Sequence, residues 1–283
     1  MKSVVVTGVS TGIGWGTTKV LTKKGFHVFG SVRKEADAQR LKQEFGDKVT
    51  PLVFDVTDEA GVRRAAAEVR AALKGETLFG LVNNAGVAIT GPVLDIDPDE
   101  FRKQMDVNLT GPLLVTQAFG PLLGADKSLK GAPGRIVNIS SVAGKMAFPF
   151  MAPYAASKFA VEAFSEALRR EMMLFGIDVV VVAPGAVKTP IWDKADEVDI
   201  SHYSNSAYFP SLKKFQELFI ASGKTGLTAE VLGKTILKAL TVKNPKVRYA
   251  PVAGRLQNWI IPRLLPKRMV DRAIAKQAGL LPS

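Results

Sequence analysis

Short runs of β-forming residues alternate with longer helical patterns along most of this chain. Between the runs, apolar residues repeat with a period near 3.6, for example over 61–73, 101–123 and 155–175. This alternation predicts parallel strands that are joined by helical crossovers. The runs are almost continuously apolar, as expected for strands that helices cover on both faces. The predicted strands span residues 4–7, 27–32, 49–54, 78–83, 135–140 and 177–183, with a last strand near 246–250.

The pattern therefore predicts an α/β fold, a doubly wound, Rossmann-like parallel sheet of about seven strands with helices on both faces. The length of 283 residues and a hydrophobic content of 47% suit one large domain spanning 1–283. No apolar run reaches the roughly 18–20 residues that a membrane-spanning helix needs. No cleavable signal is recognisable either, so we expect a cytoplasmic protein.

The part of the chain that follows the sixth predicted strand is patterned more loosely. We expect residues 186–225 to form a substrate lid, with a helix over 211–221. A second helix is expected over 228–240, where Thr228 provides the cap. Residues 253–283 form a basic tail that is expected to be helical and amphipathic.

Charge and composition exclude several kinds of site. The absence of cysteine excludes disulfides and thiolate chemistry, and His27 and His202 lack a metal-ligand spacing, so no metal site is expected. The segment from Arg255 to Lys276 contains six basic residues and a single acid, Asp271, so +5 of the net charge of +12 lies in the tail. The chain has no interleaved aromatic and basic pattern, so we expect no nucleic-acid partner. Contact of the tail with an anionic membrane surface and docking of the tail on the body both remain open.

A glycine-rich stretch, Thr7-Gly8-Val9-Ser10-Thr11-Gly12-Ile13-Gly14, closes the first predicted strand and opens a helix. In this position Gly8 permits a tight turn, Gly12 lets the backbone approach a pyrophosphate, and Gly14 lets the helix pack closely. The spacing is G-x-x-x-G-x-G. Such a stretch predicts a nucleotide site, although an ordinary strand-to-helix turn also uses glycine.

Tyr154 and Lys158 form the second chemical motif, thirteen residues after Ser141. On a helix, positions four apart lie on one face. A phenol titrates near ~10, so it exchanges protons poorly at neutral pH unless a charge stabilises its anion. We expect the Lys158 ammonium to lower the pKa of Tyr154, which would let the phenol act as a general acid or base.

These motifs, together with Asn83-Asn84-Ala85-Gly86 and Asn108, resemble the short-chain dehydrogenase/reductase family in its compact single-domain form. The resemblance is clear to about residue 190 and weak beyond it. It implies an NAD(P)-dependent oxidoreductase that interconverts a carbonyl and an alcohol by hydride transfer. It also implies a catalytic group of four residues, namely Asn108, Ser141, Tyr154 and Lys158.

The resemblance gives each of the four a role. Tyr154 would donate the proton in reduction and accept it in oxidation, while Ser141, rather than its neighbour Ser140, would hydrogen-bond the substrate oxygen. Lys158 would also bind the nicotinamide ribose. Asn108 would hold a water that links Lys158 to solvent, although a purely structural role for Asn108 stays open.

Further cofactor contacts are implied at the ends of several strands. Asp55 and Val56 would face the adenine, although Asp55 also suits a cap for the next helix. Asn83 would lie on the adenosine side, and Thr189 would bind the nicotinamide carboxamide. The full expected set is Gly8, Ser10, Thr11, Gly12, Ile13, Gly14, Arg33, Asp55, Val56, Asn83, Ala85, Gly86, Tyr154, Lys158, Pro184, Gly185, Val187 and Thr189.

The end of the second predicted strand indicates which cofactor is preferred. An enzyme for NAD usually places an acid there, on the ribose 2′-hydroxyl, whereas this chain has Val32. The neighbouring Ser31, Arg33 and Lys34 offer a hydroxyl and cations to a 2′-phosphate. We therefore expect NADP(H) to be preferred, with NAD(H) possible if Arg33 and Lys34 are ordinary surface charges.

Aromatic residues flank the predicted site and favour a lipophilic ketone, aldehyde or alcohol as substrate. The helix that bears Tyr154 carries more apolar surface than one sheet needs, so we expect a homodimer or homotetramer, as the resemblance implies. The alternatives are a nucleotide-binding sensor or regulator without turnover and a sugar-nucleotide epimerase. The aromatic and apolar residues concerned are Phe148, Pro149, Phe150, Met151, Trp192, Tyr203, Tyr208 and Phe209.

Overall fold

The computed structural model describes residues 2–188 and 199–282. Seven parallel strands form one sheet in the order β3-β2-β1-β4-β5-β6-β9, and β7 pairs with β8 in a small second sheet. The predicted doubly wound α/β fold is confirmed. The strands are β1 Ser3–Val6, β2 His27–Val32, β3 Val49–Val53, β4 Gly80–Asn83, β5 Arg135–Ile139, β6 Asp178–Val182, β7 Val187–Lys188, β8 Leu227–Thr228 and β9 Arg248–Tyr249.

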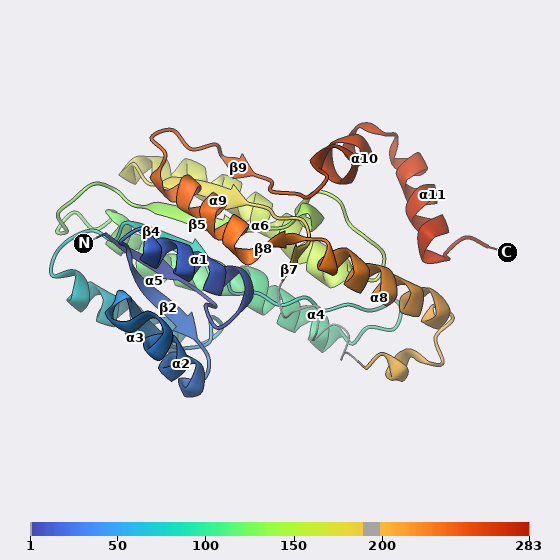
Figure 1. Ribbon diagram of the computed structural model, residues 1–283, viewed down its shortest axis with the longest axis horizontal. Coiled ribbons are helices and arrows are strands. Elements are labelled where there is room, and N and C mark those ends of the chain that lie inside the picture. Colours follow the sequence, from blue (N-terminus) through green and yellow to red (C-terminus); the bar gives the residue numbers. More distant parts are fainter. Residues whose placement is uncertain (1, 189–198, 283) are drawn as a thin grey trace.

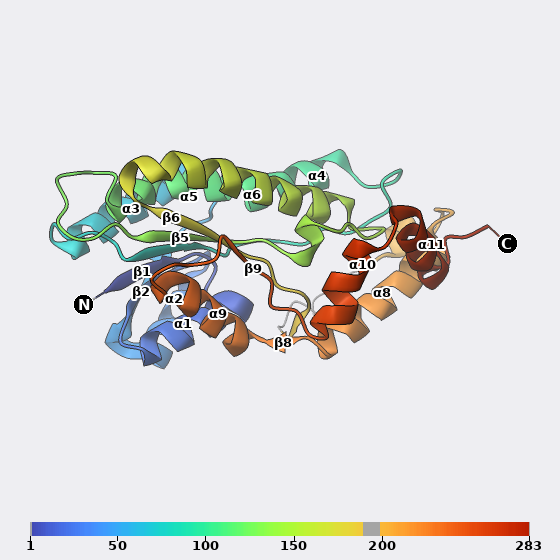
Figure 2. The same cartoon turned by 90° about the horizontal axis from the view of Figure 1, so that it is seen from above.

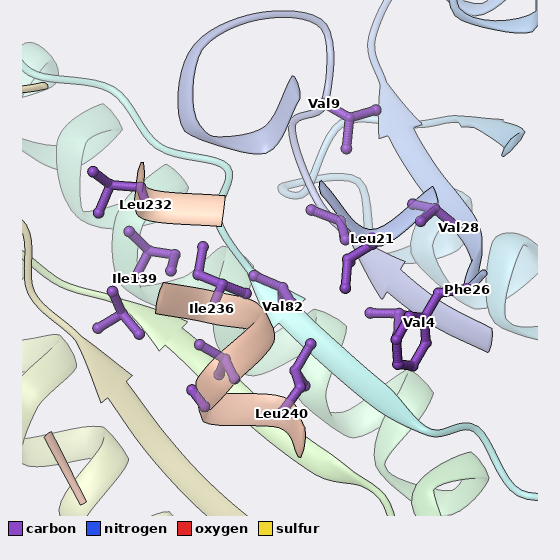
Figure 3. Close-up of a cluster of buried hydrophobic side chains, with 14 of the residues drawn as sticks. Val4, Val9, Leu21, Phe26, Val28, Val82, Ile139, Leu232, Ile236 and Leu240 are labelled. Carbon is purple, nitrogen blue, oxygen red and sulfur yellow. The ribbon is translucent and has the colours of Figure 1, made fainter. Parts of the chain in front are cut away.

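Helices cover both faces of the large sheet, which Figure 2 shows edge-on. On one face, helices α1, α2 and α9 bury a cluster that includes Leu21, Leu232 and Ile236 against Val82 of β4 (Figure 3). Helices α3, α5 and α6 cover the other face. These helices are α1 Gly12–Lys23, α2 Glu35–Phe45, α9 Ala229–Thr241, α3 Glu59–Leu73, α5 Gly111–Phe119 and α6 Ala152–Glu171.

The helix predicted over 101–123 is interrupted. It consists of α4 (Pro98–Met105), a π-helical segment (Asp106–Thr110), α5 and a 3₁₀ turn. Pro112 has no N–H to offer the carbonyl of Asn108, and the N–H of Gly111 instead reaches the carbonyl of Asp106, five residues back. The irregular segment matters because it contains Asn108.

From residue 209 to residue 278 the chain is mostly helical, as predicted. Helix α8 (Phe209–Lys224) is longer than the expected 211–221, and the hydroxyl of Thr228 caps α9 by accepting from the N–H of Val231. The tail forms a π-helical segment (Leu256–Ile260) and then α10 (Ile261–Leu264) and α11 (Lys267–Ala278). Figure 1 places α10 and α11 at one end of the molecule, beside α8. Within the described ranges, no helix is long and apolar enough to cross a membrane.

Trp259 fixes the start of this tail to the body. Its side chain is buried, and the guanidinium groups of Arg248 and Arg263 lie 4.8 and 4.5 Å from its ring centre. Arg248 also donates to both carboxylate oxygens of Glu162, at 3.1 Å each. Because Glu162 belongs to α6, one turn beyond Lys158, the tail, the edge strand β9 and helix α6 share one network.

Candidate active site at the carboxyl ends of the strands

In the glycine-rich turn between β1 and α1, backbone atoms come so close together that two positions have no room for a side chain. Gly8 has φ +70°, and a Cβ there would lie 2.9 Å from the Cα of Ala85. A Cβ on Gly14 would collide with the carbonyl oxygen of Gly8. Glycine at these two positions therefore lets β1, α1 and the loop after β4 meet.

Asn84, which sequence reasoning did not single out, holds this turn in place. Its Nδ2 donates to the carbonyls of Thr7 (2.8 Å) and Gly8 (3.1 Å). In return the hydroxyl of Thr7 accepts from the N–H groups of Asn84 and Ala85, at 2.9 and 3.0 Å. Asn84 thus joins the two loops on which a nucleotide would lie.

The side chain of Asn83 lies in the core, which corrects its expected contact with the cofactor. It is buried, and its Nδ2 donates to Thr116 (3.1 Å) and Asn138 (2.9 Å). Successive residues at the end of a strand point to opposite sides, so one of two adjacent asparagines must face inward. That alternation predicts that the two side chains differ, but it does not say which of them faces the turn.

The residues around the start of α1 fit the phosphates of a dinucleotide. No side chain caps this helix and no acid lies in its first turn, so its N–H groups and its dipole face outward. They open on a hollow of about 290 Å³ that Ser10, Thr11, Gly12 and Trp15 line, together with Arg40, Lys188 and Ala229. An uncapped N-terminus beside such a hollow can bind anionic oxygens.

At the end of β2, fewer groups are available to bind a phosphate than the sequence predicted. The hydroxyl of Ser31 is buried and accepts from the N–H of Gly8 at 3.0 Å, so it is not available. Arg33 is exposed and lies 3.8 Å from Asp55, a weak surface pair. Asp55 accepts from the N–H and hydroxyl of Thr57, and Asp58 is the N-cap of α3, so the expected helix cap at Asp55 is wrong.

Ser141 and Tyr154 meet at the end of β5. Ser141 precedes a 3₁₀ turn and accepts from the N–H of Ala143 at 3.1 Å, and its side chain hydrogen-bonds the Tyr154 hydroxyl. Ser140 is buried and donates to the Lys158 carbonyl at 3.5 Å. The geometry therefore brings Ser141, and not Ser140, to the phenol.

Lys158 does not lower the pKa of Tyr154 in this structure, contrary to expectation. Burial raises the pKa of Tyr154 above its ordinary value of 10.0, and the hydrogen bond with Ser141 opposes this rise. The Lys158 ammonium instead donates to the carbonyl of Ile139 at 2.9 Å and lies 5.7 Å from the centre of the tyrosine ring. Burial lowers the pKa of Lys158 itself to about 8. At neutral pH both groups therefore carry their protons.

Replacing Lys158 with methionine is expected to change how stability depends on pH. The folded lysine has a pKa of about 8, below the 10.5 of an ordinary lysine, so the unfolded chain binds this proton more tightly. The free energy of unfolding of the wild type therefore rises, relative to Lys158→Met, as the pH rises from about 8 to 10.5. Urea unfolding across this range measures the difference. A difference that stays constant, or the same change in the exposed control Lys23→Met, would contradict the burial effect.

Asn108 links the loop after β4 to the helix that bears Tyr154. Its Oδ1 accepts from the N–H of Val87 (2.9 Å), and its Nδ2 donates to the carbonyl of Val87 and the hydroxyl of Ser157, both at 3.0 Å. Gly86 lies between this residue and the site, because a Cβ there would be 3.2 Å from Asn108 Oδ1 and 3.8 Å from Lys158 Nζ. The contacts are those of a residue that positions α6.

The remaining predicted cofactor residues lie in different surroundings. Val56 and Val187 are buried in the two clusters that flank the sheet, so their side chains serve packing. Pro184 and Gly185 follow β6, where the Pro184 carbonyl accepts from the N–H of Val142, next to Ser141. Thr189 lies outside the described residues. Ile13 is half-buried against the α1 side of the core.

A separate apolar cluster lies on the substrate side. Phe150, Tyr203 and Leu212 are buried in it, and Phe150 has a left-handed backbone with φ +63°, which is uncommon for a bulky residue. Trp192 lies outside the described residues. The partly buried members are Ile200, Tyr208, Phe209, Phe215 and Leu280, so three of the four expected lid aromatics gather here together with a residue of the tail.

Comparison with known proteins agrees with this arrangement. The family model for short-chain dehydrogenases matches residues 2–199. The chain is 38% identical to an NADPH-dependent 3-dehydrocapnine reductase of Ornithobacterium rhinotracheale, over 98% of this chain and 97% of that protein. It is 33% identical to human retinol dehydrogenase 5, over 96% and 87% of the two chains.

A solved structure agrees as well. A short-chain dehydrogenase from Burkholderia cenocepacia in complex with NADP superimposes with a TM-score of 0.71 and 26% identity, over the full length of both chains. The family is one of dehydrogenases and reductases, which supports turnover over the alternative of a sensor. On its sequence and its fold, this chain belongs to the short-chain dehydrogenase family of oxidoreductases.

Proposed function

We propose that this protein reduces a lipophilic ketone or aldehyde to the alcohol with NADPH, and that it catalyses the reverse reaction with NADP⁺. The observation that carries the proposal is the meeting of Ser141, Tyr154 and Lys158 beside an uncapped helix N-terminus. When bound, the nicotinamide supplies the hydride in reduction and accepts it in oxidation. The side chains hold the substrate oxygen and move the proton.

Tyr154 is the proton donor in reduction, because its hydroxyl carries a proton at neutral pH and lies beside Ser141 at the end of β5. Ser141 already hydrogen-bonds this hydroxyl, so an oxygen placed between the two would accept from both. After the transfer, the side-chain hydrogen bond with Ser141, which opposes the rise in the pKa of Tyr154, stabilises the phenolate. Asn108 positions α6, and with it Tyr154 and Lys158.

The cofactor preference rests on the end of β2, where Val32 replaces the acid expected for NAD and Arg33 is exposed. Because its pair with Asp55 spans 3.8 Å, Arg33 can exchange this partner for a 2′-phosphate. The relative named as NADPH-dependent and the related structure with bound NADP support the same preference. NAD(H) is the second choice.

The lipophilic substrate class is supported by the aromatic cluster around Phe150 and by a relative that is named for retinol, an apolar alcohol. A homodimer or homotetramer is supported by a separate surface. Helices α5 and α6 leave between them a hollow of about 280 Å³ lined by Leu113, Phe164, Leu168 and Met172, and Leu113 is 39% exposed. A second copy would cover this apolar face.

The experiment that tests this function compares NADPH with NADH. We expect the purified protein to bind NADPH more tightly, as followed by nicotinamide fluorescence, and to oxidise it when apolar ketones or aldehydes are added. Arg33→Ala is expected to weaken NADPH binding by roughly 10- to 100-fold, since it removes a charge-assisted bond to the phosphate, and to leave NADH binding unchanged.

Lys34→Ala is the matched control, because it removes an adjacent exposed cation. It is expected to change the binding of neither cofactor by more than a few-fold. Equal losses in the two variants would assign the preference to general surface charge. Binding of neither nucleotide by the wild type would refute the proposed function.

A further inference from the structure

The first helices of the tail turn an apolar row outward. Leu256, Ile260 and Leu264 recur every four residues and are 62%, 37% and 79% exposed. In the same segment, Trp259 is instead buried against Arg248 and Arg263. The clamp on Trp259 therefore fixes which side of the segment faces the body, and the leucines and the isoleucine are left in water, where their exposure is unfavourable.

Helix α11 follows after Pro266 and turns a cationic face outward. Arg268, Arg272 and Lys276 recur every four residues and therefore share one side of the helix. The only acid of α11, Asp271, is exposed as well and lies three residues after Arg268. Among the described residues, none of these three cations makes an ion pair. The body differs, since most of its arginines are paired, namely Arg33, Arg40, Arg63, Arg64, Arg70, Arg102, Arg135, Arg170 and Arg248.

We propose that this tail surface, made by the outward residues of 256–276, binds the surface of an anionic lipid bilayer. Acyl chains at the headgroup boundary provide an apolar environment for the row of Leu256, Ile260 and Leu264, and anionic headgroups complement the unpaired cations of α11. A protein partner would need both an apolar surface and an acidic surface on one face. Both elements project at the same end of the molecule in two perpendicular views (Figures 1 and 2).

The tail surface is joined to the substrate side of the protein. The hydroxyl of Ser211, in the first turn of α8, donates to the carbonyl of Gly279 at 2.7 Å. Leu280 packs on the cluster of Phe150, Tyr203 and Leu212. One further step rests on the proposed function. A bilayer bound at the tail lies beside this cluster, which a lipophilic substrate passes as it enters the site.

Vesicle flotation without cofactor or substrate tests the binding, so its outcome is independent of turnover. The wild type is expected to float with phosphatidylcholine vesicles that contain phosphatidylglycerol, to stay behind with pure phosphatidylcholine, and to be released in part by high salt. The triple variant Arg268→Gln, Arg272→Gln, Lys276→Gln is expected to lose binding on the order of 100-fold. The matched control Lys23→Gln, Lys24→Gln, Lys48→Gln removes the same charge from exposed positions elsewhere and is expected to bind as the wild type does.

The apolar row has its own test. Leu256→Gln with Leu264→Gln is expected to abolish the binding that remains at high salt, because the apolar contribution is not screened. Three results would overturn the proposal: no flotation of the wild type with anionic vesicles, equal losses in the triple variant and its control, or a monomer–dimer shift caused by the tail variants without any vesicle binding. Circular dichroism of each variant shows that a loss does not come from unfolding.

Discussion

Tyr154→Phe is expected to lower kcat for carbonyl reduction by about 10²- to 10⁴-fold, the usual contribution of a positioned general acid. The change removes one oxygen, and with it the proton that the substrate oxygen must receive. The ring, its packing in α6 and the ammonium of Lys158 remain, so NADPH binding is expected to stay within a few-fold of the wild type. Stopped-flow single turnover with saturating NADPH measures the chemical step directly.

Tyr249→Phe is the matched control for the loss of a phenol. Its hydroxyl accepts from the N–H of Lys246 at 3.1 Å, and its strand β9 is an edge strand of the sheet that contributes no residue to the group of Ser141, Tyr154 and Lys158. We expect this variant to keep its rate. If Tyr154→Phe turned over at the wild-type rate, or if both variants slowed equally, Tyr154 would not be the proton donor.

Arg248→Met is expected to lower the free energy of unfolding by about 3 kcal/mol, because it strands a buried carboxylate. Glu162 is 8% exposed, and without Arg248 its nearest cation is the half-exposed Lys145, at 3.9 Å. The same change removes the guanidinium from the ring of Trp259. Urea denaturation measures the loss, and the tail, which Trp259 fixes, is expected to become more sensitive to proteolysis.

Two further variants separate the effect of a buried, unpaired carboxylate from the effect of losing an arginine. Arg63→Met breaks an exposed pair with Glu59 within α3 and is expected to cost no more than about 0.5 kcal/mol. Adding Glu162→Gln to Arg248→Met removes the stranded charge and is expected to recover part of the stability. A cost for Arg248→Met no larger than that of Arg63→Met would show that the network does not stabilise the fold.

Much of the fold could be predicted because its pattern is local. Each of the seven predicted strands is observed within about two residues, and the glycine turn lies between β1 and α1 as expected. The thirteen-residue interval between Ser141 and Tyr154 also selected the serine that contacts the phenol. The oligomeric state, the cytoplasmic location and the roles of the individual site residues stay predictions.

Errors arose where a role depends on partners far away in the sequence. The hydroxyl of Ser31 is not available to a phosphate, because it accepts from the N–H of Gly8. The side chain of Asn83 is not available to a cofactor, because it donates to Thr116 and Asn138. The expected effect of Lys158 on Tyr154 failed because local spacing places two groups on one helix face but does not fix their burial or their other hydrogen bonds.

The sequence by itself determined the order of strands and helices, the glycine turn and the residue types at the site, because hydrophobic periodicity and backbone sterics act over a few residues. Only the tertiary structure decided which of two adjacent asparagines holds the turn, that burial raises the pKa of Tyr154, and that the tail turns its leucines outward around a buried Trp259. The physical reason is that burial and hydrogen bonding depend on every element that packs nearby, and those elements come together only when the whole chain folds.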